Sequence, residues 1–367
     1  MDLSIIVPTL NEKDNILPFL ERLEKALGKD ISWEVVFVDD DSYDLTANHI
    51  RTIAQKDTRV RCLQRIGRRG LSSACIEGML TSSATYLAVM DADLQHDESI
   101  LPEMFEAIKN ESYDIVVGSR YADGGSVGSW GKNRFLMSRL AIFLGSLLIR
   151  YDLKDPMSGF FILKRPYFEN VVHRLSGKGY KILLDILSSS PEGIRFKEVP
   201  YTFRTRNAGE SKLNAMVLWE YAVLCLDKTI GRVISVRFLL FVMVGFCGAI
   251  AHLVILGVAL KILGSSFTAA QTCATYVAMT SNFIINNLFT YHDRKLSGPA
   301  FIKGLCSFYL ICSIGAVVNI RIAYLLYETG VIWWLSGLLG AVIGAVWNYA
   351  ISSTFTWSEK KGTCNET

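Results

Sequence analysis

Four long apolar runs in the C-terminal third of the chain set the tightest limit on its fold. They cover residues 238–260, 267–290, 303–327 and 331–355. Each is longer than the roughly 20 residues that a helix needs to cross a bilayer, where every backbone polar group requires an internal partner. We therefore predict an all-α transmembrane domain of four helices over residues 236–358, followed by a tail at 359–367.

The loops around these runs differ in charge. Basic residues precede the first run, separate the second from the third and follow the fourth: Lys228, Arg232, Arg237, Arg294, Lys295, Lys303, Lys360 and Lys361. The other two loops hold Lys261 and Glu328. Because basic loops stay on the cytoplasmic side, we expect a multi-pass membrane protein whose termini and N-terminal domain are cytoplasmic. The N-terminus also lacks the basic start and small-residue cleavage site of a signal peptide.

The apolar region contains an internal repeat. The segment SNFIINNLFTY at 281–291 aligns with WNYAISSTFTW at 347–357. Asn282 therefore matches Asn348, and polar groups in lipid usually face a partner helix. We interpret both asparagines as contacts between helices, with a transport site as the alternative.

The first 212 residues read as a soluble α/β domain. The β-rich segments LSIIVP, WEVVFVDDDS, YLAVMDADLQ and DIVVGSR alternate with helical segments such as NILPFLERLEKAL and LPEMFEAIKN. This alternation predicts a mostly parallel sheet with helices on both faces, and ligands of such sheets bind beyond the carboxyl ends of the strands. The pattern includes neither the Gly-x-Gly-x-x-Gly nor the Walker lysine motif, and a net charge of +3 gives no reason to expect a nucleic-acid partner.

Acidic residues at one strand end are candidates for a metal site. Asp91 and Asp93 follow the apolar run YLAVM, and Gln95 could add an amide oxygen. Hard cations such as Mg²⁺ or Mn²⁺ take oxygen ligands, often one or two carboxylates together with substrate phosphates. Taken alone, Asp-x-Asp fits helix capping or solvated loop acids better, but the neighbouring segments FVDDDS and VVGSRY favour the metal.

A wider set of motifs carries a family resemblance. In order along the chain these are VPTLNE, VDDDS, GLSSACIEGM, MDADLQH, VGSRYADGG, WGKNRFLMSR, DPMSGFF, GYKILLDIL and RTRNAGESKL. The series resembles family 2 glycosyltransferases of the GT-A fold, a Rossmann-like nucleotide-diphospho-sugar transferase fold. It is most similar to the polyprenyl-phosphate glycosyltransferases, which include the dolichol-phosphate mannose synthases. The apolar region resembles the GtrA-type four-helix membrane domain.

The resemblance implies a role for individual residues. The nucleotide would contact Pro8, Glu12, Val38 and Asp40, while Asp91, Ala92, Asp93 and Gln95 would hold the metal and the donor diphosphate. Arg206 and Lys212 would close over the donor. Arg120 would contact the donor and, with Arg134 and Ser138, the acceptor phosphate. Asp91, Asp93, Arg120 and Arg134 are thus the implied catalytic set.

The reaction implied is transfer of a single sugar to a polyprenyl phosphate with inversion at the anomeric carbon. Such an acceptor needs no general base, because a phosphate with a second pKa near ~6 is largely ionised at neutral pH. GDP-mannose is the implied donor, with UDP-glucose and UDP-N-acetylglucosamine as alternatives. Leu10 stands where the family usually has tyrosine, and SYDLT and GLSSA also depart from the family pattern. The identity of the nucleotide therefore stays open. A homo-oligomer is compatible with the sequence, which does not determine the number of subunits.

Two other functions are alternatives to this one. A processive polysaccharide synthase usually carries Gln-x-x-Arg-Trp, and this sequence has no Arg-Trp pair. A translocase of lipid-linked sugar, with a regulatory soluble part, would not need the metal and phosphate motifs. In the favoured interpretation, WGKNRFLMSRLAIFLGSLLIRY forms an interfacial helix that carries Arg134 to the membrane lipid, with a core helix as the alternative. Residues 213–235 would supply a second interfacial helix and the linker.

Overall fold

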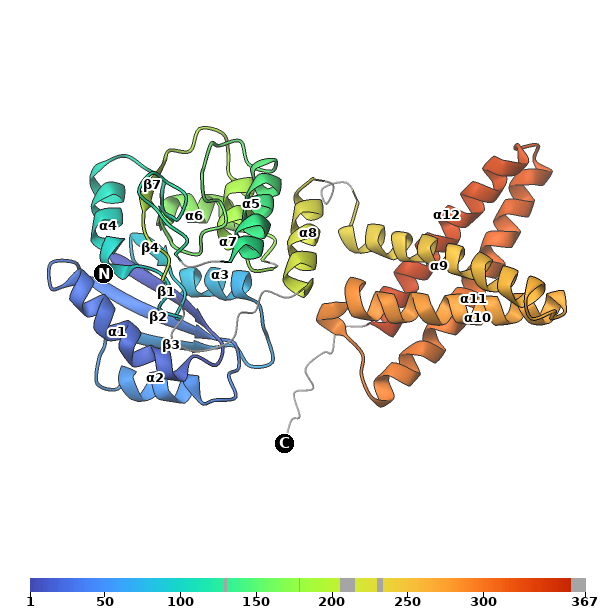
Figure 1. Ribbon diagram of the computed structural model, residues 1–367, viewed down its shortest axis with the longest axis horizontal. Helices are drawn as coiled ribbons and strands as arrows, with labels where there is room; N and C mark the ends of the chain where they lie inside the picture. The colour runs from blue at the N-terminus through green and yellow to red at the C-terminus, as the bar shows by residue number, and fades with distance from the viewer. Residues whose placement is uncertain (129–130, 178, 205–214, 230–233, 358–367) are drawn as a thin grey trace. The chain divides into compact units, whose positions relative to one another are not determined.

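A computed structural model of the chain describes residues 1–128, 131–177, 179–204, 215–229 and 234–357 (Figure 1). The chain divides into two compact units, residues 1–229 and residues 230–367, and each is considered by itself. The helix predicted within the linker at 213–235 is α8 (Ala215–Thr229), and it belongs to the first unit.

The first unit is built on a seven-stranded sheet in its described residues. The strands are β1 (Leu3–Thr9), β2 (Trp33–Asp39), β3 (Val60–Gln64), β4 (Tyr86–Val89), β5 (Ile115–Ser119), β6 (Phe161–Lys164) and β7 (Phe196–Pro200). Their order is β3-β2-β1-β4-β6-β5-β7, and β6 alone among them runs antiparallel to its neighbours. The mostly parallel sheet expected from the sequence is therefore confirmed, although the sequence had revealed only β1, β2, β4 and β5.

Helices cover both faces of this sheet (Figure 1). One face packs against α1 (Lys13–Leu27), α2 (Thr46–Ala54) and α4 (Leu101–Asn110). The other packs against α3 (Leu71–Thr81), α5 (Lys132–Ser146), α6 (Arg165–Val171), α7 (Ile182–Ser189) and α8. Short 3₁₀ turns occupy Glu98–Ile100 and Val172–Arg174. Alternating strand residues supply the two cores, as Ile5 faces one core and Ile6 the other.

The contact between α3 and the sheet depends on a glycine. A Cβ added at Gly78 would lie 2.4 Å from Cγ2 of Ile6 and 2.8 Å from Cγ2 of Val38. Real side chains do not approach so closely, so only glycine lets α3 lie this near to β1 and β2. This contact fixes α3 directly beneath the strands whose ends carry the nucleotide-side candidates Pro8, Val38 and Asp40.

The second unit is helical. Its long helices are α9 (Val236–Lys261), α10 (Phe267–Ile285), α11 (Pro299–Glu328) and α12 (Trp333–Ile351). A π-helical turn extends α10 at Asn286–Thr290, another extends α12 at Ser352–Thr356, and a 3₁₀ turn occupies His292–Arg294. In the described residues, three segments are long and apolar enough to cross a membrane: Val236–Lys261, Pro299–Glu328 and Leu338–Thr356. The second predicted span, residues 267–290, corresponds to α10, which is not one of these three.

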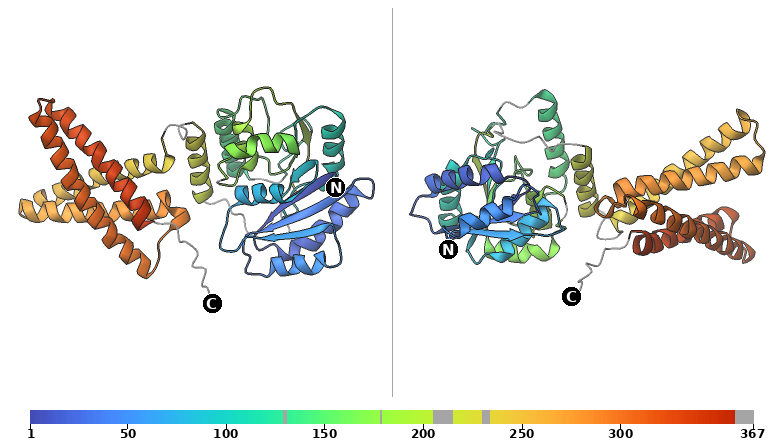
Figure 2. Two further views of the ribbon diagram at one scale, coloured as in Figure 1. Left: turned by 180° about the vertical axis from the view of Figure 1, so that it is seen from behind. Right: turned by 90° about the horizontal axis from the view of Figure 1, so that it is seen from below.

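These helices form two hairpins, α9 with α10 and α11 with α12 (Figure 2). The aligned asparagines make the same contact in each hairpin. A Cβ on Gly248 of α9 would lie 2.1 Å from Oδ1 of Asn282, and one on Gly315 of α11 would lie 2.1 Å from Oδ1 of Asn348. Each asparagine thus packs directly onto a glycine of its partner helix, as expected for residues that join helices in a membrane.

The repeats meet through aromatic rings. Tyr291 and Trp357, which occupy equivalent positions of the repeat, stack with ring centroids 4.2 Å apart and planes 5° from parallel. The indole Nε1 of Trp357 donates to Oδ1 of Asn287 over 3.1 Å. Phe283 of the first hairpin packs against Phe308 of the second. This aromatic cluster is the core of the second unit in the residues described.

Candidate active site

Four parallel strands bring the polar candidates to one edge of the sheet. β1, β2, β4 and β5 point the same way, and the candidates Glu12, Asp40, Asp91 and Arg120 follow or end them. Because the carboxyl ends of parallel strands share an edge, residues far apart in the sequence meet there. The structure thus places the predicted strand-end residues around one site.

The turn after β4 holds the two candidate carboxylates. Leu94 has a φ of 61°, a left-handed conformation that leucine rarely adopts. Oδ1 of Asp93 accepts a hydrogen bond from the Gln95 backbone N–H over 3.1 Å, which stabilises this turn. The Gln95 side chain donates from Nε2 to the carbonyl of Arg204 over 3.0 Å. Local backbone strain of this kind is common at functional sites, where surrounding contacts maintain it.

His96 fixes the position of Asp91, a role that its place in the motif MDADLQH does not reveal. The backbone N–H of Asp91 donates to Nδ1 of His96 over 3.3 Å, and Nε2 lies 3.8 Å from Oδ2 of Asp91. The imidazole is 2% exposed and stacks on Phe160. Burial lowers the pKa of His96 to about 4, so the ring is neutral at physiological pH. His96 therefore orients Asp91 without adding a positive charge beside it.

The donor atoms on this turn suit a hard cation. Asp91 and Asp93 offer carboxylate oxygens and Gln95 an amide oxygen, and both carboxylates lie near His96. The described residues contain no cluster of three His, Cys, Asp or Glu side chains at metal-binding distance. A cation here would need further oxygens, as Mg²⁺ commonly obtains from substrate phosphates and water. The residues present fit such a partly open site.

Arg120 is held by a partner that the sequence analysis did not identify. Its Nε and Nη2 each donate over 2.8 Å to a different carboxylate oxygen of Asp155, and its backbone N–H donates over 3.1 Å. Asp155 is fully buried and Arg120 is 9% exposed. Burial opposes the charge on Arg120, but the bonds to Asp155 outweigh it and raise the pKa of the guanidinium. Asp155 therefore fixes the orientation of the Arg120 guanidinium.

Lys181 is a second residue that the sequence analysis missed. Its Nζ donates to the carbonyl of Met157 over 3.4 Å, just before α7 begins. Burial and the positive charges of Arg120 and Arg134 lower the pKa of Lys181 to about 8, against the opposing effect of Asp91. These couplings show that Lys181, Asp91, Arg120 and Arg134 lie close enough to influence one another. Lys181 lies within the GYKILLDIL motif, and this motif was the feature of the sequence that could have identified it as a site residue.

α5 carries the other two acceptor candidates. Arg134 and Ser138 are four residues apart and so lie on one face of this helix. The hydroxyl of Tyr121, next to Arg120, donates to Oγ of Ser138 over 2.9 Å, which brings the predicted trio together. Large apolar side chains of α5 and the following turn are exposed: Phe135, Leu136, Leu140, Phe143 and Leu147. Such an uncovered apolar surface fits a membrane interface better than the alternative of a core helix.

The candidates for nucleotide binding differ in whether their backbone or their side chains could contact a ligand. The side chains of Val38 and Ala92 are buried in the two cores, so only their backbone atoms could meet a ligand. Oδ2 of Asp40 accepts from the Gly70 N–H over 2.7 Å, and Oδ1 lies 3.3 Å from Nη1 of Arg65. Burial raises the pKa of Asp40 despite these contacts.

The remaining nucleotide-side candidates lie nearer the surface of the site. Oε2 of Glu12 accepts from the Asn15 amide over 2.6 Å, and Pro8 is half-buried. Arg206 and Lys212 lie outside the described residues. Their segment follows Arg204, whose backbone N–H donates to the carbonyl of Gln95 over 2.9 Å.

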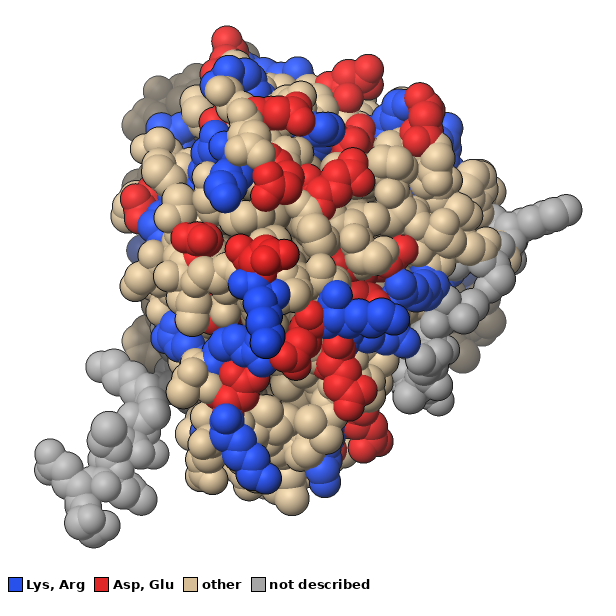
Figure 3. Space-filling model, turned by 90° about the vertical axis from the view of Figure 1, so that its left-hand side faces the viewer, with Lys and Arg blue, Asp and Glu red and all other residues tan. Residues whose placement is uncertain are grey.

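Two further arginines, Arg204 and Arg139, lie near the site but are not among the predicted site residues. Arg204 forms ion pairs with Asp97 at 2.7 Å and Glu98 at 2.6 Å, which tie residue 204 to the turn after β4. Arg139 is exposed on α5. Figure 3 shows that acidic and basic side chains are interspersed on the face it presents, without a continuous basic field.

Comparison with known proteins identifies both units. Residues 4–172 match the family model described as glycosyl transferase family 2, and residues 240–357 match the GtrA/DPMS transmembrane domain. The chain is 36% identical over 362 residues to a dolichol-phosphate mannosyltransferase of Pyrococcus furiosus, covering 98% of this chain and all of that protein. It is also 36% identical over 229 residues to the Saccharomyces cerevisiae dolichol-phosphate mannosyltransferase, covering 60% of this chain and 84% of the yeast protein.

Among solved structures, the glucosyl-3-phosphoglycerate synthase of Mycobacterium tuberculosis, in complex with Mn²⁺, UDP-glucose and glycerol 3-phosphate, gives a TM-score of 0.46 at 19% identity. That alignment covers 62% of this chain and 79% of the synthase. The full-length match to the archaeal protein is the stronger finding, since it includes the membrane unit as well as the sheet. The chain is a glycosyltransferase and belongs to the dolichol-phosphate mannosyltransferase family, with a family 2 catalytic unit joined to a GtrA/DPMS membrane domain.

Proposed function

We propose that this enzyme transfers one mannose from GDP-mannose to the phosphate of a polyprenyl (dolichyl) phosphate, giving a β-linked lipid-phosphate sugar. One observation supports this proposal most strongly. Arg120, Arg134, Ser138 and Lys181 lie near Asp91, and the helix α5, which carries Arg134 and Ser138, has an exposed apolar face. The names of the full-length and catalytic-domain relatives support mannose and dolichyl phosphate as the substrates.

On the donor side, Asp91, Asp93 and Gln95 would hold Mg²⁺ or Mn²⁺, which supplies a Lewis acid for the charge of the leaving diphosphate. His96 keeps the Asp91 carboxylate oriented, and Lys181 adds a cation within reach of the same charge. Fixed cations of this kind stabilise negative charge as it develops in the transition state. Pro8, Glu12, Val38 and Asp40 would contact the nucleotide, and Arg206 and Lys212 would close over it.

On the acceptor side, the difficulty is electrostatic. A lipid phosphate must approach an anionic donor, and the repulsion between them grows as water is excluded. Arg134 and Arg120 would bind this phosphate, with Ser138 donating a hydrogen bond. The phosphate oxygen then attacks the anomeric carbon from the face opposite the diphosphate, which leaves with its bonding electrons and inverts that centre. No residue has to remove a proton, because the acceptor is already ionised.

The exposed face of α5 would place this reaction at the membrane surface, on the cytoplasmic side favoured by the basic loops. We assign catalysis to residues 1–212, the interfacial helix and linker to 213–235, and anchoring to 236–358, with a cytoplasmic tail at 359–367.

The test is to incubate purified full-length protein with polyprenyl phosphate and radiolabelled GDP-mannose, UDP-glucose or UDP-N-acetylglucosamine, and to extract the lipid. We expect mannosyl lipid from GDP-mannose alone. Exclusive use of a UDP-sugar would refute the donor assignment. Leu10, which replaces the tyrosine usual in the family, is the residue that leaves the choice of nucleotide open. Asp93→Asn protein and wild type in excess EDTA should both lose most turnover, whereas the surface variant Arg139→Ala should not. Full activity of Asp93→Asn would remove the metal site from the mechanism.

A further inference from the structure

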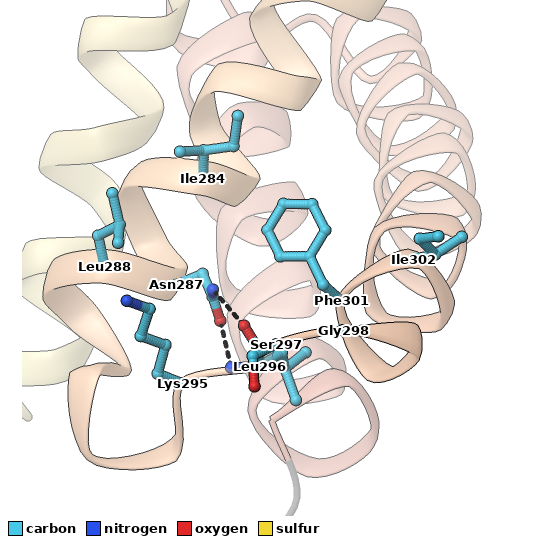
Figure 4. Close-up of a pocket in the computed structure, with 9 residues that line it drawn as sticks. All are labelled: Ile284, Asn287, Leu288, Lys295, Leu296, Ser297, Gly298, Phe301 and Ile302. Carbon is cyan, nitrogen blue, oxygen red and sulfur yellow. Dashed lines mark hydrogen bonds between the residues drawn. The ribbon is translucent and has the colours of Figure 1, made fainter.

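The second unit contains a pocket that the catalytic assignment does not use. It has a volume of about 460 Å³ and lies where the end of α10 turns through residues 291–298 into α11 (Figure 4). Apolar side chains form most of its lining, with Ile284 and Leu288 on one side and Phe301 on the other. The size is within the range of about 300–1,000 Å³ that is usual for small-ligand sites.

The pocket is preformed by buried contacts. The Asn287 carboxamide is 1% exposed and bonds both backbone groups of Leu296, donating to the carbonyl over 3.0 Å and accepting from the N–H over 2.8 Å. The Leu296 side chain lies over Gly304, where an added Cβ would meet Cδ1 at 2.4 Å. Phe301 packs edge-on against Phe283 with centroids 5.0 Å apart. The walls are therefore fixed without an occupant.

The mouth of the pocket carries a positive charge. Lys295 lines it, and among the side chains that the structure describes no carboxylate pairs with this lysine. Ile284, Leu288 and Ile302 are 38%, 36% and 65% exposed on the surface of the unit. A cation at the end of an apolar cavity complements an anionic headgroup attached directly to a hydrocarbon chain.

The lining favours one chemical class of occupant. Its polar side chains are Lys295, Ser297 and Asn287, and the last is already bonded to Leu296. The ester carbonyls and glycerol oxygens of a diacyl phospholipid would enter an apolar cavity with few donors to meet them, which is costly. A single-chain lipid phosphate brings only the phosphate, for Lys295 and Ser297, and a hydrocarbon chain.

The internal repeat gives an independent indication. Asn282 and Asn348 are conserved between the two halves of this chain, as are the aromatic positions Tyr291 and Trp357. The pocket positions are not, because Ile284 and Leu288 correspond to Ala350 and Thr354. The first hairpin therefore departs from the second where the apolar wall is built.

We propose that this pocket is a second binding site for polyprenyl phosphate, which holds the acceptor lipid in the membrane unit apart from the catalytic phosphate site. The inference rests on the proposed acceptor, and it gives the membrane unit a role in substrate binding beyond anchoring.

The experiment counts lipid molecules bound to the full chain in detergent by native mass spectrometry, with long-chain polyprenyl phosphate, polyprenol and dioleoyl phosphatidate as probes. We expect two equivalents of polyprenyl phosphate on wild type. Leu288→Trp fills the pocket and Lys295→Glu reverses its charge, so each should bind one equivalent and weaken the second at least tenfold. Leu325→Trp, at an exposed position of α11 away from the pocket, should bind two.

The catalytic variant Arg134→Ala separates this inference from the proposed function. It should bind one equivalent, and its combination with Leu288→Trp none. Two equivalents on Arg134→Ala would contradict the catalytic acceptor site and leave the pocket standing. Two equivalents on both Leu288→Trp and Lys295→Glu, or equal competition by phosphatidate, would overturn the pocket assignment. Thermal melting of Leu288→Trp in detergent should match that of Leu325→Trp, which shows that the membrane unit of the variant is folded.

Discussion

At the scale of single residues, the site consists of charged groups positioned by neighbours distant in the sequence. Asp91, Asp93 and Arg120 could be predicted because they stand in ordered motifs at strand ends, and Arg134 because it stands in the motif WGKNRFLMSR. Their supports could not, since the pairing of Arg120 with Asp155 spans 35 residues and depends on how the loop before β6 folds. His96 and Lys181 stand in the motifs MDADLQH and GYKILLDIL, but their roles were missed because those roles depend on the burial that brings them near Asp91.

Arg134→Ala should separate donor binding from acceptor binding. If Arg134 binds the lipid phosphate, its loss removes a charged contact worth roughly 2–5 kcal/mol, so kcat/KM for the acceptor should fall about 30-fold or more. Affinity for the sugar nucleotide, measured by calorimetry, should stay near wild type. Arg139→Ala on the same helix is the control. A collapse of donor affinity with unchanged dependence on acceptor would place Arg134 in the donor site.

Lys181 should give the reaction an alkaline limb. Its amine attracts the donor diphosphate only when protonated, and its pKa is lowered to about 8, so kcat/KM for the donor should fall as pH rises through that value. Lys181→Arg should move this limb to higher pH. The folded chain also releases this proton at lower pH than the unfolded chain, so the free energy of unfolding should rise between pH 8 and 10.5. An identical pH profile in Lys181→Arg would exclude the assignment.

At the scale of secondary structure, the strands that are buried could be predicted from the sequence, and the partly exposed strands could not. β1, β2, β4 and β5 are almost wholly buried apolar runs, and each was predicted. β3 and β7 lie at the two edges of the sheet, are partly exposed and include charged residues, so their pattern does not differ from that of a loop. β6 has four residues and runs antiparallel between β4 and β5, a placement that the alternation of strands and helices does not predict.

The close approach of α3 to the sheet can be tested at Gly78. Gly78→Val would force carbon atoms into Ile6 and Val38, and overpacking of a core typically costs about 1–3 kcal/mol. We expect a lower melting temperature in detergent and weaker nucleotide binding, because the Val38 backbone is a proposed contact. Gly131→Ala, whose added Cβ meets nothing within 4 Å, should change both little. Equal melting temperatures for Gly78→Val and wild type would show that α3 can move away from the sheet.

At the scale of the whole chain, the apolar runs that begin at residue 238 predicted two units, and the structure divides the chain between residues 229 and 230. The boundary proposed at residue 212 omits α8, which makes several contacts with the catalytic unit. The Tyr221 hydroxyl donates to the carbonyl of Ala141 in α5 over 2.7 Å. Lys228 forms an ion pair with the fully buried Asp185 of α7.

Two truncations follow from these contacts. A chain ending at Thr229 should fold and transfer mannose to a short-chain acceptor in detergent, because it retains α8 and all catalytic candidates. A chain ending at Lys212 should be far less stable, since it leaves Asp185 charged and buried without Lys228, a loss that typically costs about 3–5 kcal/mol. Thermal melting and transfer assays on both chains decide the boundary. A stable, active protein ending at Lys212 would show that α8 is dispensable.

The stacked pair Tyr291 and Trp357 also gives the membrane unit a built-in optical signal. The indole of Trp357 is fully buried and lies nearly parallel to the Tyr291 ring at the junction of the two hairpins. Light absorbed by the phenol can therefore pass to the indole, whose emission reflects a dry environment. Separation of the hairpins would break that transfer and shift the emission to longer wavelength. Fluorescence of a chain that keeps Trp357 as its sole tryptophan would then follow assembly of the membrane unit in lipid.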